Sequence, residues 1–116
     1  MQGQPIEQFI KSLGGLHDAT LTNLHWYLED KRLEFGIEDI YSNFHGLPNY
    51  PGATKGKFIF SDVKKLIVEV KLSEVGLMVF DWTVTKDMSD NFCSEIRFSP
   101  GGLVVVECAH IECVKR

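Results

Sequence analysis

The sequence predicts an α+β protein that is rich in β structure: about seven strands in a strongly twisted or partly closed antiparallel sheet, with one N-terminal helix. Three observations lead to this prediction. One segment, residues 5–15, repeats its apolar residues with the period of a helix. Much of the remaining chain alternates apolar and polar residues with a period of two, as half-buried strands do. The connections are mostly short and polar or glycine-rich, which favours antiparallel neighbours.

The predicted helix begins at Pro5 and ends before Gly14. Proline is favoured at the first helical position, and glycine just beyond the last one. Apolar residues recur at positions i, i+3, i+4 and i+7, namely Ile6, Phe9, Ile10 and Leu13. We expect this short amphipathic helix to lie against the sheet.

The predicted strands cover residues 20–28, 33–37, 58–60, 66–72, 78–85, 93–98 and 103–114. The polar residues 29–31 join the first two strands as a hairpin, and Pro100-Gly101 suits the centre of a type II turn. The last segment is apolar on both parities, which is expected of a strand covered on both faces. The apolar parity of each segment predicts a core of Phe9, Leu24, Trp26, Leu33, Phe35, Phe60, Val68, Met78, Phe80, Trp82, Ile96, Phe98 and Val104.

Length and composition restrict the class of protein. The 116 residues suit one domain, residues 1–116, and 44% apolar residues can fill its core. The net charge of −4 argues against nucleic acid and anionic membranes as partners. No apolar segment has the length of a membrane span, and the N-terminus has no export signal. Three cysteines without a CxxC pair indicate a reducing cytoplasm.

The alternation breaks from Tyr41 to Gly56, a loop longer than is usual in a compact domain. Long loops are commonly functional, and this one mixes aromatic rings with groups that form directional hydrogen bonds. An equally weighted alternative is an ordered loop that caps the open end of the sheet with its own aromatic residues. The candidate binding residues are Tyr41, Asn43, Phe44, His45, Asn49 and Tyr50.

Two clusters could bind a metal ion, but neither is expected to do so. His17-Asp18 precedes a strand and lacks the further ligands of a phosphohydrolase centre, so we expect it to hydrogen-bond the backbone at the junction. Strand parity places Cys108 and His110 on one face and Cys113 on the other, so the three cannot converge. We therefore predict buried free thiols, no metal and no cofactor.

Other polar groups also have a structural explanation. The alternation of Asp87, Ser89 and Asn91 resembles the start of a calcium loop, but Phe92 stands where that loop needs glycine, so we predict a hairpin turn. No local motif activates a nucleophile, so no catalytic residue is predicted. Glu107 lies among apolar residues, and it would be at a sheet edge, paired with a residue such as Arg97, or in a pocket.

The motif Leu16-His17-Asp18-Ala19, followed by an alternating strand to Tyr27 and a hairpin partner, resembles the start of a loose group of small bacterial β-rich domains. Some of that group look like immunity proteins of polymorphic toxin systems. The resemblance covers about the first third of the chain and implies inhibition by binding, without a catalytic centre. Such proteins are often small and acidic, which is compatible with the charge of −4.

These observations predict a non-enzymatic cytoplasmic binding domain that has a protein partner and is of the immunity type. The predicted partner surface is the loop of residues 41–51 together with adjacent acidic residues, and a homo-oligomer is compatible with the sequence. One alternative is a small-molecule pocket inside the curved sheet, lined by aromatic residues such as Trp26, Phe35, Phe80 and Trp82. A less favoured alternative is a small hydrolase that uses His17, Asp18 and His45.

Overall fold

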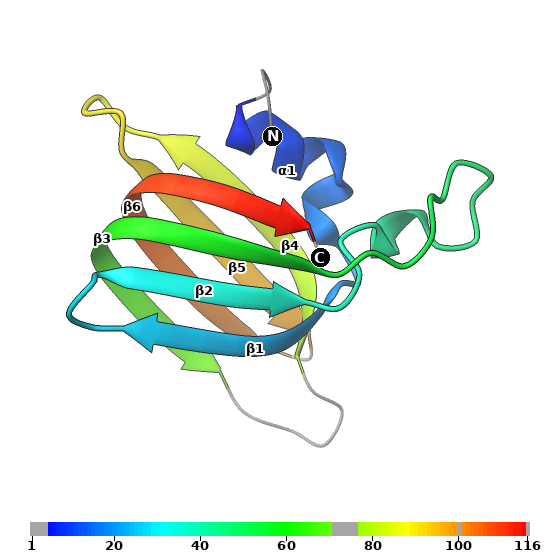
Figure 1. The fold of residues 1–116 in the computed structure, drawn as a ribbon, viewed down its shortest axis with the longest axis horizontal. Coiled ribbons are helices and arrows are strands. Elements are labelled where there is room, and N and C mark those ends of the chain that lie inside the picture. Colours follow the sequence, from blue (N-terminus) through cyan, green and yellow to red (C-terminus); the bar gives the residue numbers. More distant parts are fainter. Residues whose placement is uncertain (1–4, 71–76, 100, 116) are drawn as a thin grey trace.

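The computed structural model describes residues 5–70, 77–99 and 101–115 (Figure 1). Within these ranges the chain forms one α-helix, two single-turn 3₁₀ helices and six strands. In chain order they are α1 (Ile6–Ser12), η1 (Gly14–Leu16), β1 (Thr20–Tyr27), β2 (Arg32–Ile37), η2 (Ser42–Phe44), β3 (Gly56–Val70), β4 (Leu77–Lys86), β5 (Phe92–Ser99) and β6 (Gly102–Lys115). The α+β class and the N-terminal helix are therefore confirmed. The predicted turn at Pro100 and residues 71–72 of a predicted strand lie outside the described residues.

The six strands form one antiparallel sheet in the order β1-β2-β3-β6-β5-β4, and β4 pairs back with β1 to close a barrel. The prediction of seven strands was wrong because residues 58–60 and 66–72 fall mainly in one long strand, β3. Asp62 has a φ of 53°, and the pairing with β6 shifts register between Val63 and Lys65. A bulge of this kind bends a strand without ending it, but in the sequence it resembles a turn.

The long strands β3 and β6 turn the corner of the barrel. β3 pairs with β6 along its length, from Gly56 to Val70, but only residues 56–60 also pair with β2. One half of the barrel contains β1, β2 and the adjoining ends of β3 and β6, and the other contains β4, β5 and the opposite ends of the same two strands. Figure 1 shows the strands of the two halves crossing at a large angle.

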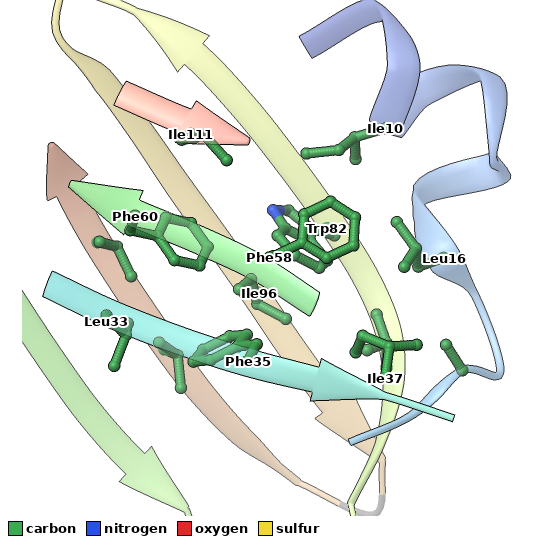
Figure 2. Close-up of a cluster of buried hydrophobic side chains, with 14 of the residues drawn as sticks. Ile10, Leu16, Leu33, Phe35, Ile37, Phe58, Phe60, Trp82, Ile96 and Ile111 are labelled. Carbon is green, nitrogen blue, oxygen red and sulfur yellow. The ribbon is translucent and has the colours of Figure 1, made fainter. Parts of the chain in front are cut away.

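The barrel interior is filled by aromatic and aliphatic side chains (Figure 2). Trp82 is central: its ring lies 4.6 Å from that of Phe58 and 6.2 Å from those of Phe35 and Phe60, centroid to centroid. α1 contacts β4 and adds its apolar residues to this cluster, so the helix covers one opening of the barrel. No helix of the described residues is long and apolar enough to cross a membrane.

Eight of the thirteen predicted core residues are buried, and Leu24 is half-buried. Four are exposed, with the exposed fraction of each in parentheses: Trp26 (37%), Val68 (42%), Met78 (37%) and Phe80 (58%). In β4 the cause is a register shift between Val79 and Asp81, which places both Val79 and Trp82 inside and turns the two intervening side chains outward. Trp26 lies on β1 beyond the two residues that pair with β4, so no strand covers that side of it among the described residues.

Candidate functional site

The loop between β2 and β3, residues 38–55, projects from one end of the barrel (Figure 1). Its base is closed by backbone hydrogen bonds: the Glu38 N–H donates to the Thr20 carbonyl (3.0 Å), and the Ile40 N–H donates to the Thr54 carbonyl (2.9 Å). Ile40 itself is fully buried, so the chain is still part of the core where the loop begins.

Asp39 fixes the loop through its carboxylate. Oδ1 accepts the backbone N–H groups of Tyr41 (3.0 Å) and Thr54 (3.1 Å), and Oδ2 accepts the hydroxyl of Tyr50 (2.5 Å). The main-chain carbonyl of Asp39 also accepts the Ser42 hydroxyl. The carboxylate therefore joins residues 2, 11 and 15 positions away in sequence and gives the loop a defined shape.

These contacts also set the charge state of Asp39. Partial burial by itself would raise the pKa, but the hydrogen bonds from Tyr50, Thr54 and Tyr41 together outweigh it and hold the pKa of this carboxyl below its usual value. The same bond raises the pKa of the Tyr50 phenol, because the phenol is a donor to an anion. At neutral pH the site is thus a carboxylate held by three donors.

The base of the loop packs on the barrel. Tyr41 and Phe44 are half-buried and contact the edge of the hydrophobic core. The Lys115 ammonium of β6 lies 5.6 Å from the centre of the Tyr41 ring. The Asn43 side chain occupies the space above Gly14, where a Cβ atom would collide with it. Tyr41, Asn43 and Phe44 therefore anchor the loop to the barrel. For the two aromatic residues this agrees with the alternative in which the loop caps the open end of the sheet.

The tip of the loop, residues 45–49, is exposed throughout. It contains His45 and Asn49 from the predicted set, and Leu47, which has 52% of its surface exposed. The rings of His45 and Tyr50 meet edge to face with centroids 5.3 Å apart. Of the six predicted residues, His45 and Asn49 thus belong to the exposed tip. The other four belong to the anchoring base, since Tyr50 is half-buried and bonded to Asp39.

Asp39 and Leu47 were missed by the sequence analysis. Leu47 and its neighbour Pro48 lie in a stretch without periodicity, so nothing marked them as exposed. Asp39 carries a local signal that could have found it: an aspartate two residues before a backbone N–H that it can accept is the pattern of an Asx turn. Its bonds to Tyr50 and Thr54 have no local signal.

The motif from Leu16 to Ala19 joins β1 to β4. The Asp18 N–H donates to the Val79 carbonyl (2.8 Å), and the Val79 N–H donates to the Ala19 carbonyl (2.7 Å). Nδ1 of His17 lies 2.8 Å from the Phe80 carbonyl oxygen and donates to it. The expectation that His17 or Asp18 hydrogen-bonds the backbone is confirmed for the His17 side chain, but its acceptor lies on β4 and not at the junction between helix and strand. The motif therefore helps to close the barrel.

The three residues near the C-terminus are not arranged as predicted. Cys108 is fully buried and Cys113 is half-buried against the core, whereas His110 is exposed. The prediction that Cys108 and His110 share one face was wrong. Cys108 and Ile111 both face inward although they are three positions apart, so the alternation shifts by one residue between them, opposite the irregular segment of β3. Among the described residues, no cluster of three or more His, Cys, Asp or Glu side chains could hold a metal ion.

Two further predictions concern polar side chains. The hairpin turn between β4 and β5 is confirmed, since Asp87 Oδ1 accepts the N–H groups of Ser89 (2.8 Å) and Asn91 (3.0 Å). Glu107 is half-exposed and its ion-pair partner is Lys65, 3.7 Å away on the neighbouring strand β3. Arg97 instead lies 3.5 Å from Glu95.

Protein-family models give no match to this chain, and the curated proteins give no match either.

Burial predicts how the thiols react. It raises the pKa of Cys108 to about 12 and that of Cys113 to about 11, and burial together with Glu107 and Glu95 raises the pKa of Cys93. Thiolates are the reactive form, so we expect all three to react slowly with a disulfide reagent at pH 8, with Cys108 slowest. Thiol titration of the native protein and of the protein in denaturant checks this. Rapid stoichiometric labelling of native Cys108 would contradict the structure.

Proposed function

We propose that this protein is a non-enzymatic binding domain with a protein partner, and that the loop tip, residues 45–49, contacts that partner. The observation that carries the proposal is the combination of an exposed tip with a base fixed by Asp39. A segment already held in one shape loses little conformational entropy on binding, so more of its contact energy contributes to affinity.

The chemistry of the tip supports a protein partner. His45 adds an exposed aromatic ring, Leu47 adds exposed apolar surface, and Asn49 can donate and accept hydrogen bonds. Residues 41–51 contain no Asp, Glu, Lys or Arg, so the tip can be desolvated without removing a formal charge from water. A protruding segment of this composition suits insertion into a concave partner surface.

The class of partner is proposed from charge and resemblance. A net charge of −4 favours association with a basic protein. This long-range attraction comes from the charge of the whole molecule, since the tip itself carries no formal charge. The motif Leu16–Ala19 resembles bacterial immunity-type domains, so we propose an immunity-type inhibitor that acts in the bacterial cytoplasm. Its free cysteines suit a reducing compartment.

A small-molecule site inside the barrel is the second candidate. Two buried polar atoms of the described residues, Trp82 Nε1 and Ser94 Oγ, have no hydrogen-bond partner, and a bound molecule could satisfy them. Against this, Phe35, Phe58 and Phe60 surround Trp82 at ring-contact distances. Native mass spectrometry of the purified protein would detect such a ligand.

The tip proposal predicts a separation between stability and binding. Phe44→Ala should destabilise the fold by about 1–3 kcal/mol because half-buried aromatic surface is lost. Leu47→Ala should leave the thermal midpoint almost unchanged, yet weaken association by about 1–2 kcal/mol, since apolar side chains buried at an interface account for effects of this size. Thermal unfolding and titration calorimetry measure the two quantities.

The partner needed for this measurement can be obtained by photocrosslinking in cells. A benzophenone amino acid at position 47 should capture a protein that the same group at Thr83, an exposed position on β4, does not capture. Equal capture from both positions, or an unchanged affinity in Leu47→Ala, would remove the tip from the site.

A further inference from the structure

A hollow of about 460 Å³ lies on the outer face of the barrel, over β1, β2 and the start of β3. These three strands pair with one another and lie side by side at the front of Figure 1. The walls of the hollow include the aromatic rings of His25 and Tyr27 and the charged side chains of Glu34, Lys55 and Lys57. A volume of this size is typical of sites that bind small molecules.

A bulge in β1 brings two consecutive polar side chains to this hollow. The pairing of β1 with β2 shifts register between Leu21 and Asn23. As a result Thr22 and Asn23 are both exposed, and both line the hollow. Asn23 Nδ2 donates to Thr22 Oγ1 (3.3 Å), which leaves the proton of the hydroxyl for another acceptor. Bulges are frequent next to functional sites, where they redirect side chains.

Gly36 of β2 makes room for these two side chains. A Cβ atom at this position would lie 2.6 Å from both Thr22 Oγ1 and Asn23 Nδ2. Glycine weakens the interior of a strand, and it commonly marks a position where another group approaches closely. The backbone of Gly36 does not have a positive φ, so the glycine provides space and not an unusual conformation. The bulge and the glycine together therefore place two polar side chains over the backbone of β2.

Glu34 gathers cations beside these polar side chains. Its carboxylate is only 14% exposed, and its two oxygens lie 2.9 Å from Arg32 Nε and 3.3 Å from Lys57 Nζ. Burial by itself would raise the pKa of the Glu34 carboxyl, but the hydrogen bonds and charges of Lys57 and Arg32 outweigh it and hold the pKa below its usual value. The Arg32 guanidinium also lies over the Tyr27 ring, 4.4 Å from its centre, so this cation is fixed on two sides.

The hollow is locally positive, although the whole chain has a net charge of −4. Of the residues that line it, Lys55 and Lys57 are cationic and Glu34 is anionic. Arg32, bonded to the same carboxylate, adds a further positive charge. An ammonium group has three N–H donors, and the contact with Glu34 uses one of those on Lys57. Donors therefore remain on both lysines for a second acceptor.

We propose that the hollow binds the oxyanion, phosphate or carboxylate, of a small organic molecule. Lys55 and Lys57 contact the oxyanion, and Thr22 and Asn23 donate hydrogen bonds to it. Hydrogen bonds between ionised groups are shorter and stronger than those between neutral groups. An oxyanion on a small molecule responds mainly to charges within about 10 Å, whereas a nucleic acid would also meet the net negative charge of the chain. A small molecule is therefore favoured over a polyanion.

The remainder of the ligand would border two aromatic rings. The rings of His25 and Tyr27 have centroids 6.3 Å apart and are inclined by 35°. Both line the hollow beside the charged groups, so a ligand that carries a ring next to its oxyanion fits these walls. This proposal does not rest on the function of the loop tip. It is tested on the purified chain without a protein partner, so each proposal can fail separately.

Nuclear magnetic resonance titration of the isotope-labelled full chain tests the site with three probes that share a phenyl ring: phenyl phosphate, benzoate and neutral benzyl alcohol. We expect the amide shifts of Gly36, Gly56 and Lys57 to saturate with at least one of the two anions, with a dissociation constant of about 1 mM or below. The anion that binds more tightly identifies the oxyanion as phosphate or carboxylate. Benzyl alcohol should bind about tenfold more weakly or less, because it cannot form charge-assisted hydrogen bonds.

Variants locate the binding. Lys57→Gln should weaken binding of the anion about fivefold, the upper range for one exposed ion pair. Lys64→Gln is the matched control, because it removes the same charge from an exposed position of β3 outside the hollow, and it should bind as the native protein does. Asn23→Ala, at an exposed position, keeps every charge and should weaken binding about threefold through one lost hydrogen bond.

The amide spectrum of each variant shows whether it is folded, and the exposed Asn23 provides a test even if Lys57→Gln does not fold. Three results would each overturn the proposal. The first is the absence of saturable shifts with both anions up to about 20 mM, far above the expected dissociation constant. The second is equal affinity for benzyl alcohol and the anions. The third is native affinity in Asn23→Ala together with equal affinities in the two lysine variants.

Discussion

Phe58→Ala should lower the free energy of unfolding by about 3–5 kcal/mol, the usual cost of removing a buried phenylalanine from a packed core. The Phe58 side chain is fully buried, and its ring is the closest of the phenylalanines that contact Trp82, with centroids 4.6 Å apart. The resulting cavity would lie at the centre of the barrel, where the closed strands limit how far the neighbouring side chains can relax.

Phe80→Ala is the matched control, with the same chemical change on the outer face of the barrel. Phe80 is 58% exposed, and its one described ring contact is with His17 at 5.7 Å, so we expect a loss below about 1 kcal/mol. Urea unfolding followed by circular dichroism and tryptophan fluorescence measures both variants. Similar losses would show that the parity assigned to β4 is wrong.

This pair of variants also illustrates what the sequence could predict. Alternation placed Trp82 and Phe80 on one face, because a regular strand sends residues i and i+2 to the same side. The register shift between Val79 and Asp81 inserts one extra residue, and nothing in the apolar pattern marks it. The partner that holds this irregularity, the motif around His17, is more than 60 residues away in sequence.

The number of strands was overestimated for a related reason. Ser61-Asp62 interrupts an apolar run and resembles a turn, whereas Asp62 adopts a positive φ and the strand continues around the corner of the barrel. Aspartate tolerates this conformation better than most residues, so the same composition suits a bulge and a turn. Only pairing with β6 distinguishes them.

For the candidate site, the break in alternation correctly located a long loop, but composition could not divide it into base and tip. That division depends on which side chains reach the barrel. Tyr41 and Phe44 do so because the chain after the buried Ile40 still runs along the core, and Leu47 does not. Residue type alone gives no reason to separate an anchoring phenylalanine from an exposed leucine.

Asp39→Ala should destabilise the protein by about 2–3 kcal/mol and release the loop. The Tyr50 hydroxyl and the N–H groups of Tyr41 and Thr54 would all lose their acceptor, and a donor left unsatisfied costs about 1–3 kcal/mol when buried. These donors are only partly buried, so water recovers some of that cost. Hydrogen exchange should show faster exchange of the Thr54 amide, and Glu38→Ala, which alters the exposed neighbouring carboxylate, should have little effect on either measurement.

Acid should remove the same stabilisation from the native protein. The pKa of Asp39 is lower in the folded than in the unfolded chain, where a value of about 3.9 applies. The contribution of Asp39 to the free energy of unfolding is therefore fully present above about pH 4 and declines as the pH falls through the folded pKa.

Asp39→Asn keeps the size of the side chain but cannot titrate, so the difference in the free energy of unfolding between this variant and the native protein should narrow below pH 4. Glu34, whose carboxyl also has a lowered pKa, titrates in both proteins, so its contribution cancels in the comparison. A difference that stays constant from pH 7 to pH 2 would show that hydrogen bonding to the ionised carboxylate of Asp39 does not stabilise the loop.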